Sequence, residues 1–288
     1  MSQPRKSPTN RLLGYPDDAR LLIINADDLG MSHAANAAIL RAMREGVVRS
    51  TSLMTPCPWA PHAMRLLREN PALPFGVHLT LVCEGLDYRW GPLASKNTVS
   101  SLVDETGYFY SYERIPELLE RARLDEVEIE FRAQIETVLA ANLKPTHLDW
   151  HCLRNGGRDD IFELSLGLAK AYGLALRAYD PPYIDQLQSQ GFPTDDHVLL
   201  DSYRLDTTDK PAQYARLLRE LPAGLSEWAV HPGLDHAELQ AIEPESWQVR
   251  FTDFEFVTSP EARAIIQQEG IILLSYQPLQ AVWQGKLS

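Results

Sequence analysis

The chain has 288 residues, 44% of them hydrophobic, and its 39 acidic and 27 basic residues give a formal net charge of -12. This acidity argues against a nucleic acid or an anionic membrane as the main partner, and no apolar run approaches transmembrane length. The three cysteines (Cys57, Cys83 and Cys152) have neither the spacing of a zinc knuckle nor that of a disulfide framework. We therefore expect a soluble protein of the reducing cytoplasm.

Short apolar strands alternate with amphipathic helices along the chain. We expect strands at residues 20–26, 47–54, 74–81, 145–151, 174–178, 198–203, 226–231 and 270–275. We expect helices at residues 33–45, 61–69, 113–121, 126–142, 160–172, 211–220 and 259–268. Repeated βα units predict a parallel sheet, and about eight of them predict a closed barrel.

The predicted fold class is therefore α/β, an irregular TIM-like (β/α) barrel. We expect one domain over residues 20–288, preceded by a flexible tail at residues 1–19. Two segments interrupt the alternation, residues 84–112 after the third strand and residues 180–197 after the fifth. Both are rich in residues that favour turns, and both predict long loops.

The first strand runs from leucines and isoleucines directly into two adjacent aspartates, Asp27 and Asp28. Adjacent ionised carboxylates repel each other, so a buried pair needs a cation or a network of donors. His78, His151 and His231 lie at or just beyond the ends of three later strands. Barrel enzymes place their chemistry at the carboxyl ends of the strands, so we expect these five residues to gather there. A lone buried histidine is more often a core residue, but their recurrence with aspartates favours a metal site.

Four motifs resemble the YdjC-like carbohydrate deacetylases. They are Asn-Ala-Asp-Asp-Leu-Gly at 25–30, Gly-Val-His-Leu at 76–79, Lys-Pro-Thr-His-Leu-Asp-Trp-His at 144–151 and His-Pro-Gly at 231–233. The resemblance covers nearly the whole chain. It implies an irregular (β/α) barrel, a divalent metal (Mg²⁺ or Zn²⁺), a homodimer, and hydrolysis of an N-acetyl group from an amino sugar or oligosaccharide.

The resemblance also implies roles for individual residues. Asp28, His78 and His151 would be the metal ligands, Asp27 the general base, and His231 the general acid. Two histidines and one carboxylate leave positions open on a divalent metal for water and a substrate carbonyl.

Three further residues are expected to support these groups. His147, Asp149 and His151 share one face of their strand, so His147 or Asp149 is expected to orient His151 through its second ring nitrogen. Arg177, at the end of another strand, is expected to hold Asp27 in its ionised form. The alternative for Arg177 is a surface ion pair.

The chain departs from the family after the third motif. Family members usually continue with further histidines, whereas this chain reads Cys-Leu-Arg-Asn-Gly-Gly at 152–157. The expected metal ligand His151 is kept, but the part of the loop expected to face the sugar has changed. The sequence therefore predicts metal binding more firmly than it predicts which sugar is bound.

Two other functions stay open at this stage. The first is another metallohydrolase on the same barrel, either a phosphoesterase or an amidase. A phosphoesterase would need basic residues near the site to bind phosphate, and the only candidates are Arg154, Arg158 and Arg177. A non-catalytic carbohydrate-binding barrel is the other, although such a protein would be expected to have lost a base or a ligand.

Overall fold

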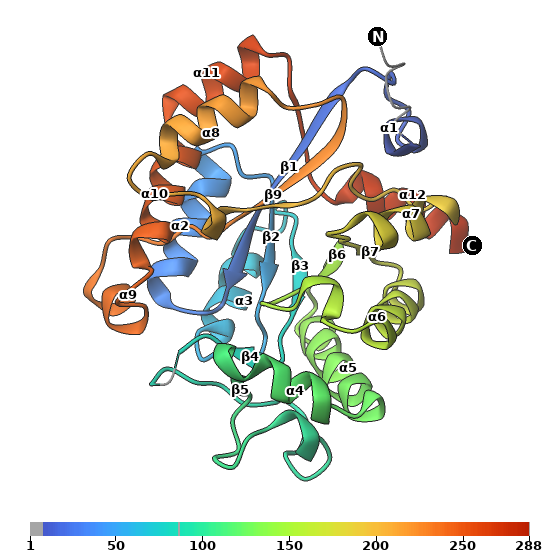
Figure 1. The fold of residues 1–288 in the computed structure, drawn as a ribbon, viewed down its shortest axis with the longest axis vertical. Coiled ribbons are helices and arrows are strands. Elements are labelled where there is room, and N and C mark those ends of the chain that lie inside the picture. The colour runs from blue at the N-terminus through green and yellow to red at the C-terminus, as the bar shows by residue number, and fades with distance from the viewer. Residues whose placement is uncertain (1–7, 86, 288) are drawn as a thin grey trace.

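The computed structural model describes residues 8–85 and 87–287 and shows a central parallel sheet with helices around it (Figure 1). The strands are β1 (Arg20–Leu29), β2 (Ser50–Leu53), β3 (Gly76–Leu79), β6 (His147–Trp150), β7 (Ala175–Leu176), β8 (Leu200–Asp201), β9 (Gly224–Val230) and β10 (Ile272–Leu274). Their order across the sheet is β7-β6-β3-β2-β1-β9-β8, and β10 pairs with the first half of β1. Every strand that the sequence predicts is present.

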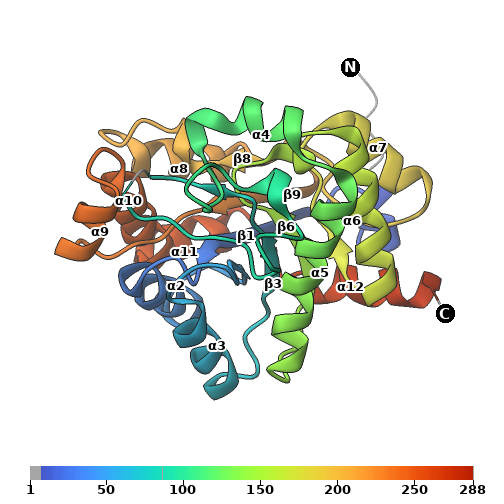
Figure 2. The ribbon, with the colours of Figure 1, turned by 90° about the horizontal axis from the view of Figure 1, so that it is seen from below.

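The sheet curls into a half-barrel, which confirms the predicted α/β barrel-like fold. The helices around it are α1 (Pro8–Leu12), α2 (His33–Glu45), α3 (Ala60–Glu69), α4 (Ile115–Arg121), α5 (Leu124–Ala140), α6 (Asp159–Tyr172), α7 (Pro181–Ser189), α8 (Lys210–Arg219), α9 (Ala237–Ile242), α10 (Trp247–Thr258), α11 (Pro260–Gln268) and α12 (Gln277–Leu287). Figure 2 looks onto the carboxyl ends of the strands, with β1, β3, β6 and β9 in the middle. Within residues 8–85 and 87–287, the edge strands β7 and β8 do not pair with each other, so the expected closure is incomplete.

The seven predicted helices all form, each beginning within two residues of its expected start. Helix α2 shows the local reason. The side chain of Ser32 caps the helix by accepting a hydrogen bond of 3.0 Å from the backbone N–H of Ala35. None of the helices in the described part of the chain is long and apolar enough to cross a membrane.

Five α-helices of residues 8–85 and 87–287 were not predicted. One of them, α7, occupies much of the expected loop at residues 180–197, and α1 lies within the expected flexible tail. Thr9 and Asn10 of α1 are fully buried, and Thr9 donates a hydrogen bond to the carbonyl of Thr194, so this part of the expected tail is folded against the domain. Residues 1–7 of the expected tail lie outside the described residues. Polar contacts such as these leave no hydrophobic periodicity in the sequence.

Helix α10 was missed for a different reason. It contacts α2, α8 and α11, and its buried residues include both apolar Phe254 and Val257 and charged Arg250 and Asp253. A helix that is covered on several sides lacks the single apolar face that sequence patterns detect. This omission matters because α10 contributes to the site described below.

The long loop predicted after the third strand is present. Of the described residues 84–85 and 87–109, Ser100–Leu102 form a short 3-10 helix and Val103 and Phe109 form a single bridge, and the rest form neither helix nor strand. The flanking strands β4 (Val82–Cys83) and β5 (Tyr110–Ser111) pair in parallel. This β4–β5 segment lies below the carboxyl ends of the central strands in Figure 1.

Candidate active site

The acidic and histidine residues of the sequence motifs converge at the carboxyl ends of the strands. Asp27 and Asp28 lie near the end of β1, His78 lies in β3, and His151 directly follows β6. All four residues are at most 3% exposed. Buried polar groups of this kind require partners, and the structure shows which partners they have.

Three of these residues point donor atoms at one another. Oδ1 of Asp28 lies 3.3 Å from Nε2 of His78 and 3.2 Å from Nδ1 of His151. Ligand bonds of about 2.1 Å place neighbouring donors of one ion roughly 3.0–3.4 Å apart. These residues, which we call the Asp28 group, therefore fit a divalent metal ion, and a set of two histidines and one carboxylate is typical of catalytic sites.

The backbone at the end of β1 is unusual. Asp28 has a φ of 69°, in the left-handed region that residues with a side chain rarely adopt. Gly30 has a φ of 100°, and a Cβ there would lie 3.0 Å from the carbonyl oxygen of Met54. Strained backbone of this kind concentrates at functional sites, and here it fixes the position of the Asp28 carboxylate.

Arg250 of α10 pairs with Asp28 and was not predicted from the sequence. Its Nη1 donates a 2.8 Å hydrogen bond to Oδ2 of Asp28, which leaves Oδ1 for the two histidines. Burial by itself would raise the pKa of Asp28, but Arg250 and the two histidines hold it well below its usual value. The carboxylate therefore stays ionised, as a metal ligand must.

Asp27 has a separate cation. Nη1 and Nη2 of Arg177 each donate a 2.9 Å hydrogen bond to one oxygen of Asp27, and the side-chain amide of Asn25 donates a third, of 2.6 Å. Burial would raise the pKa of Asp27, but Arg177 and His78 outweigh it and lower the pKa. Arg177 is fully buried, so this pair is not the surface ion pair weighed as the alternative.

Asp149 supports His78 and not His151. In the register of the sheet His78 pairs directly with Asp149, and Nδ1 of His78 lies 2.8 Å from Oδ1 of Asp149. Burial lowers the pKa of His78, but Asp149, together with Asp28 and Asp27, outweighs burial and raises it to about 10. The expectation that Asp149 orients His151 is therefore wrong, because side-chain alternation within one strand does not show which neighbour lies across from it.

His147 does not orient His151 either. Its ring stacks on Tyr276 with centroids 3.7 Å apart, and its Nδ1 lies 3.0 Å from Oγ1 of Thr146. The neighbours of His151 are instead Asp28 at Nδ1 and Glu84 and Cys152 at Nε2. Burial is the largest influence on His151 and lowers its pKa, which favours the neutral ring that binds metals.

His231 lies on the other side of β1 from His78 and His151, just after β9. Its Nδ1 lies 2.8 Å from the hydroxyl of Ser202, and its backbone N–H donates a 2.8 Å hydrogen bond to Asp253. Nζ of buried Lys210 lies 2.6 Å from the other oxygen of Asp253. His231 is half-buried, so its position is fixed while part of its surface reaches solvent.

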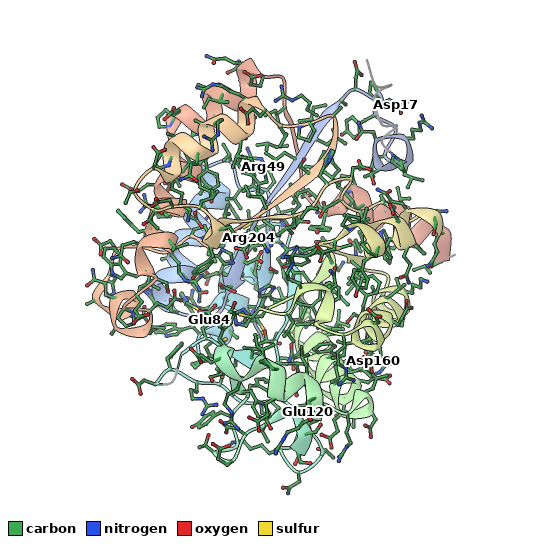
Figure 3. All side chains as sticks on the ribbon, in the orientation of Figure 1. Asp17, Arg49, Glu84, Glu120, Asp160 and Arg204 are labelled. Carbon is green, nitrogen blue, oxygen red and sulfur yellow. The ribbon has the colours of Figure 1, made fainter. Side chains whose placement is uncertain are left out.

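Sequence reasoning also missed the carboxylates around Arg250. Nε of Arg250 lies 2.7 Å from Oε1 of Glu243, and Nη2 lies 3.1 Å from Oε2 of Glu84. Figure 3 labels Glu84 near the carboxyl ends of the central strands. Glu84 lies in a loop and Glu243 just after a short helix, so no periodic pattern marks either residue.

The fold places this protein in the class of α/β barrel-like proteins, and its aspartates and histidines gather at the carboxyl ends of the strands, where proteins of that class place their active sites. A family model described as YdjC-like protein matches residues 21–268. The chain therefore belongs to the YdjC-like family.

Curated relatives and a solved structure agree with this assignment. The chain is 32% identical over 265 residues to a carbohydrate deacetylase of Enterococcus faecalis, covering 90% of this chain and 97% of the relative. It is 33% identical over 261 residues to a carbohydrate deacetylase of Thermus thermophilus, covering 86% and 90%. A crystal structure of a putative cellobiose-phosphate cleavage protein from Enterococcus faecalis matches with a TM-score of 0.78 and 30% identity over 91% of this chain and 99% of that one.

Proposed function

We propose that this protein is a metal-dependent carbohydrate deacetylase, which removes an N-acetyl group from an amino sugar or oligosaccharide. The observation that carries the proposal is that the two adjacent aspartates have different partners. Asp28 faces two histidines, as a metal ligand would, whereas Asp27 is held separately by Arg177. The names of the curated relatives support the same reaction.

The Asp28 group would hold the metal ion. An Mg²⁺ or Zn²⁺ ion bound there would polarise the amide carbonyl of the substrate and lower the pKa of a water molecule. Arg250 and Asp149 hold two of the three ligands in place, through Oδ2 of Asp28 and Nδ1 of His78. Partners of this kind orient ligands and strengthen metal binding.

We assign Asp27 as the general base. Its lowered pKa keeps it ionised at neutral pH, and Arg177 fixes both of its oxygens. Oδ2 of Asp27 lies 3.9 Å from Nε2 of His78, so the carboxylate borders the Asp28 group. From this position it can accept a proton from the water that attacks the acetyl carbonyl.

We assign His231 as the general acid. Once water has added to the amide, the leaving amine needs a proton, and a positioned histidine is the usual donor. His231 bonds to Ser202 through Nδ1, so Nε2 is the nitrogen that we assign to this transfer. The β9 strand places His231 beside the end of β1, because Val230 pairs with Ala26.

The contacts of the basic residues argue against a phosphoesterase. Arg154 is paired with Asp180, and Arg158 is paired with Asp160. Arg177 is buried among carboxylates. Each arginine that could have held a phosphate is therefore already paired with an acidic residue.

A non-catalytic carbohydrate-binding barrel is also disfavoured. Such a protein would not need a buried acid whose two oxygens are fixed by an arginine beside a set of metal donors. Asp27, Asp28, His78 and His151 are all retained and lie together.

Acetate release tests the proposal. The protein is assayed on a panel of N-acetylated mono- and oligosaccharides, including phosphorylated ones, before chelation, after chelation, and after Mg²⁺ or Zn²⁺ is restored. We expect release that disappears with the chelator and returns with the metal. Absence of release from every sugar, with metal bound, would contradict the proposed reaction.

Two matched variants separate the roles of the adjacent aspartates. We expect Asp27→Asn to keep its metal content and to lose about 10²–10⁴-fold in kcat, because the base is removed. We expect Asp28→Asn to lose one equivalent of bound metal relative to the wild type, as measured by elemental analysis. An Asp27→Asn variant with full activity would remove Asp27 from the mechanism.

A further inference from the structure

A second set of donor atoms lies on the other side of the His151 ring. Sγ of Cys152 lies 3.3 Å from Nε2 of His151, and Oε1 of Glu84 lies 3.6 Å from the same nitrogen. These three atoms lie within 4.8 Å of one another. We call these residues the Cys152 group. It shares only His151 with the Asp28 group, and none of the catalytic assignments above uses Cys152.

The backbone holds the thiol close to the ring. Cys152 has a φ of 58°, in the region that is unfavourable for a residue with a side chain. The backbone N–H of Leu153 donates a 2.7 Å hydrogen bond to the carbonyl of His151, which closes a tight three-residue turn around Cys152. Observed strain of this kind is a reason to look for a function.

Arg250 also fixes the carboxylate of the Cys152 group. Its Nη2 lies 3.3 Å from Oε1 and 3.1 Å from Oε2 of Glu84. The Glu84 side chain is 23% exposed and Cys152 is half-buried, so an ion from solvent has access to this side of the ring. The same guanidinium that presents Asp28 to one side of His151 therefore presents Glu84 to the other.

We propose that Glu84, His151 and Cys152 form a second metal site, which binds a thiophilic divalent cation such as Zn²⁺. With Zn–S bonds of about 2.3 Å and Zn–N bonds of about 2.0 Å, tetrahedral donors lie roughly 3.5 Å apart, close to the two distances observed. A cysteine ligand selects zinc-class metals over Mg²⁺. On binding, the Cys152 thiol becomes a thiolate and its proton passes to solvent.

The shared histidine links the two sites. An ion at the Cys152 group would bond Nε2 of His151, while the Asp28 group uses Nδ1 of the same ring. With both sites filled, His151 would be an imidazolate, and its ring N–H proton would also pass to solvent. Binding at one nitrogen changes the basicity of the other, so the second site is a means by which excess zinc acts on the first. The existence of the second site does not depend on the deacetylase reaction.

Cobalt titration of the metal-free, untagged full chain tests the proposal. We expect a thiolate-to-Co²⁺ charge-transfer absorption in the wild type and in Asp28→Asn, which lacks a ligand of the first site. We expect Cys152→Ser to lose this absorption and Cys57→Ala, a buried thiol outside the group, to keep it. Glu84→Gln should weaken the binding that gives rise to the absorption by at least about ten-fold.

The proposal is overturned if saturating Co²⁺ gives no such absorption in the wild type, or if the absorption survives in Cys152→Ser. A second measurement needs no variant. Alkylation of Cys152 by iodoacetamide, followed by peptide mass spectrometry, should slow by about ten-fold or more with Zn²⁺ and recover with a chelator. Mg²⁺ should have no effect. An alkylation rate that Zn²⁺ leaves unchanged would equally overturn the site.

Discussion

Two buried arginines divide the adjacent aspartates of β1 between them. Arg177, just after β7, holds Asp27, and Arg250, in α10, holds Asp28. Both arginines are 0% exposed. Neighbouring carboxylates can both stay ionised because each has a cation of its own.

The surroundings of the two arginines differ. The other carboxylates that pair with Arg177, Asp149 and Glu227, are fully buried, and Glu227 accepts a hydrogen bond from Tyr276. Arg250 instead reaches Glu84 at the rim, whose side chain is 23% exposed. Arginine–carboxylate pairing thus forms a fully buried network around Arg177. Around Arg250, it holds Asp28 and Glu84 so that one oxygen of each faces His151.

The largest expected effect is that of removing Arg177. Arg177→Met leaves Asp27, Asp149 and Glu227 buried without their common cation, which should lower the free energy of unfolding by about 3–5 kcal/mol. Urea unfolding measures this change. The matched control is Arg154→Met, which removes a largely exposed pair with Asp180 and should cost no more than about 1 kcal/mol. Equal losses in both variants would remove the distinction between the two kinds of pair.

A smaller effect is expected from removing Arg250, and it concerns metal affinity instead of stability. Arg250→Met should raise the Kd for the metal of the Asp28 group by about 10–100-fold, because Asp28 loses the partner that orients it. Calorimetric titration of the metal-free protein measures the Kd. The loss of stability should be smaller than for Arg177→Met, because Glu84 can reach solvent. A Kd unchanged from the wild type would show that Arg250 does not position the ligand.

Per pH unit, the smallest effect is a dependence of metal affinity on pH that comes from Asp149, one of the carboxylates that pair with Arg177. Asp149, with Asp28 and Asp27, raises the pKa of His78 to about 10 despite burial, so in the metal-free protein His78 is protonated below that pH. A metal at Nε2 must displace this proton, and the Kd should therefore rise by about ten-fold for each unit that the pH falls. Titrations from about pH 9 to about pH 6 measure the slope.

Asp149→Asn is the control for this slope. It removes the largest of the charges that raise the pKa of His78, so the slope should flatten in the upper part of the range. If the wild type itself shows no slope, either His78 is not a ligand or it carries no proton to displace.

The sequence by itself determined the strands and the residues at their ends. Hydrophobic alternation is local, and parallel strands share one carboxyl edge, so the pattern along the chain is enough to predict that Asp27, Asp28, His78 and His151 lie together. The capping of α2 by Ser32 is local in the same sense. Each strand end and each helix cap is set by residues that are neighbours along the chain.

Tertiary structure decided which partner each of these residues has. The register of β3 against β6 gives Asp149 to His78, and a side-chain pattern within one strand contains no information on register. Arg250 comes from a helix covered on several sides, which has no apolar face to reveal it. The charges that keep two adjacent aspartates ionised are 150 and 222 residues away along the chain, and only the packed fold brings them to the same place.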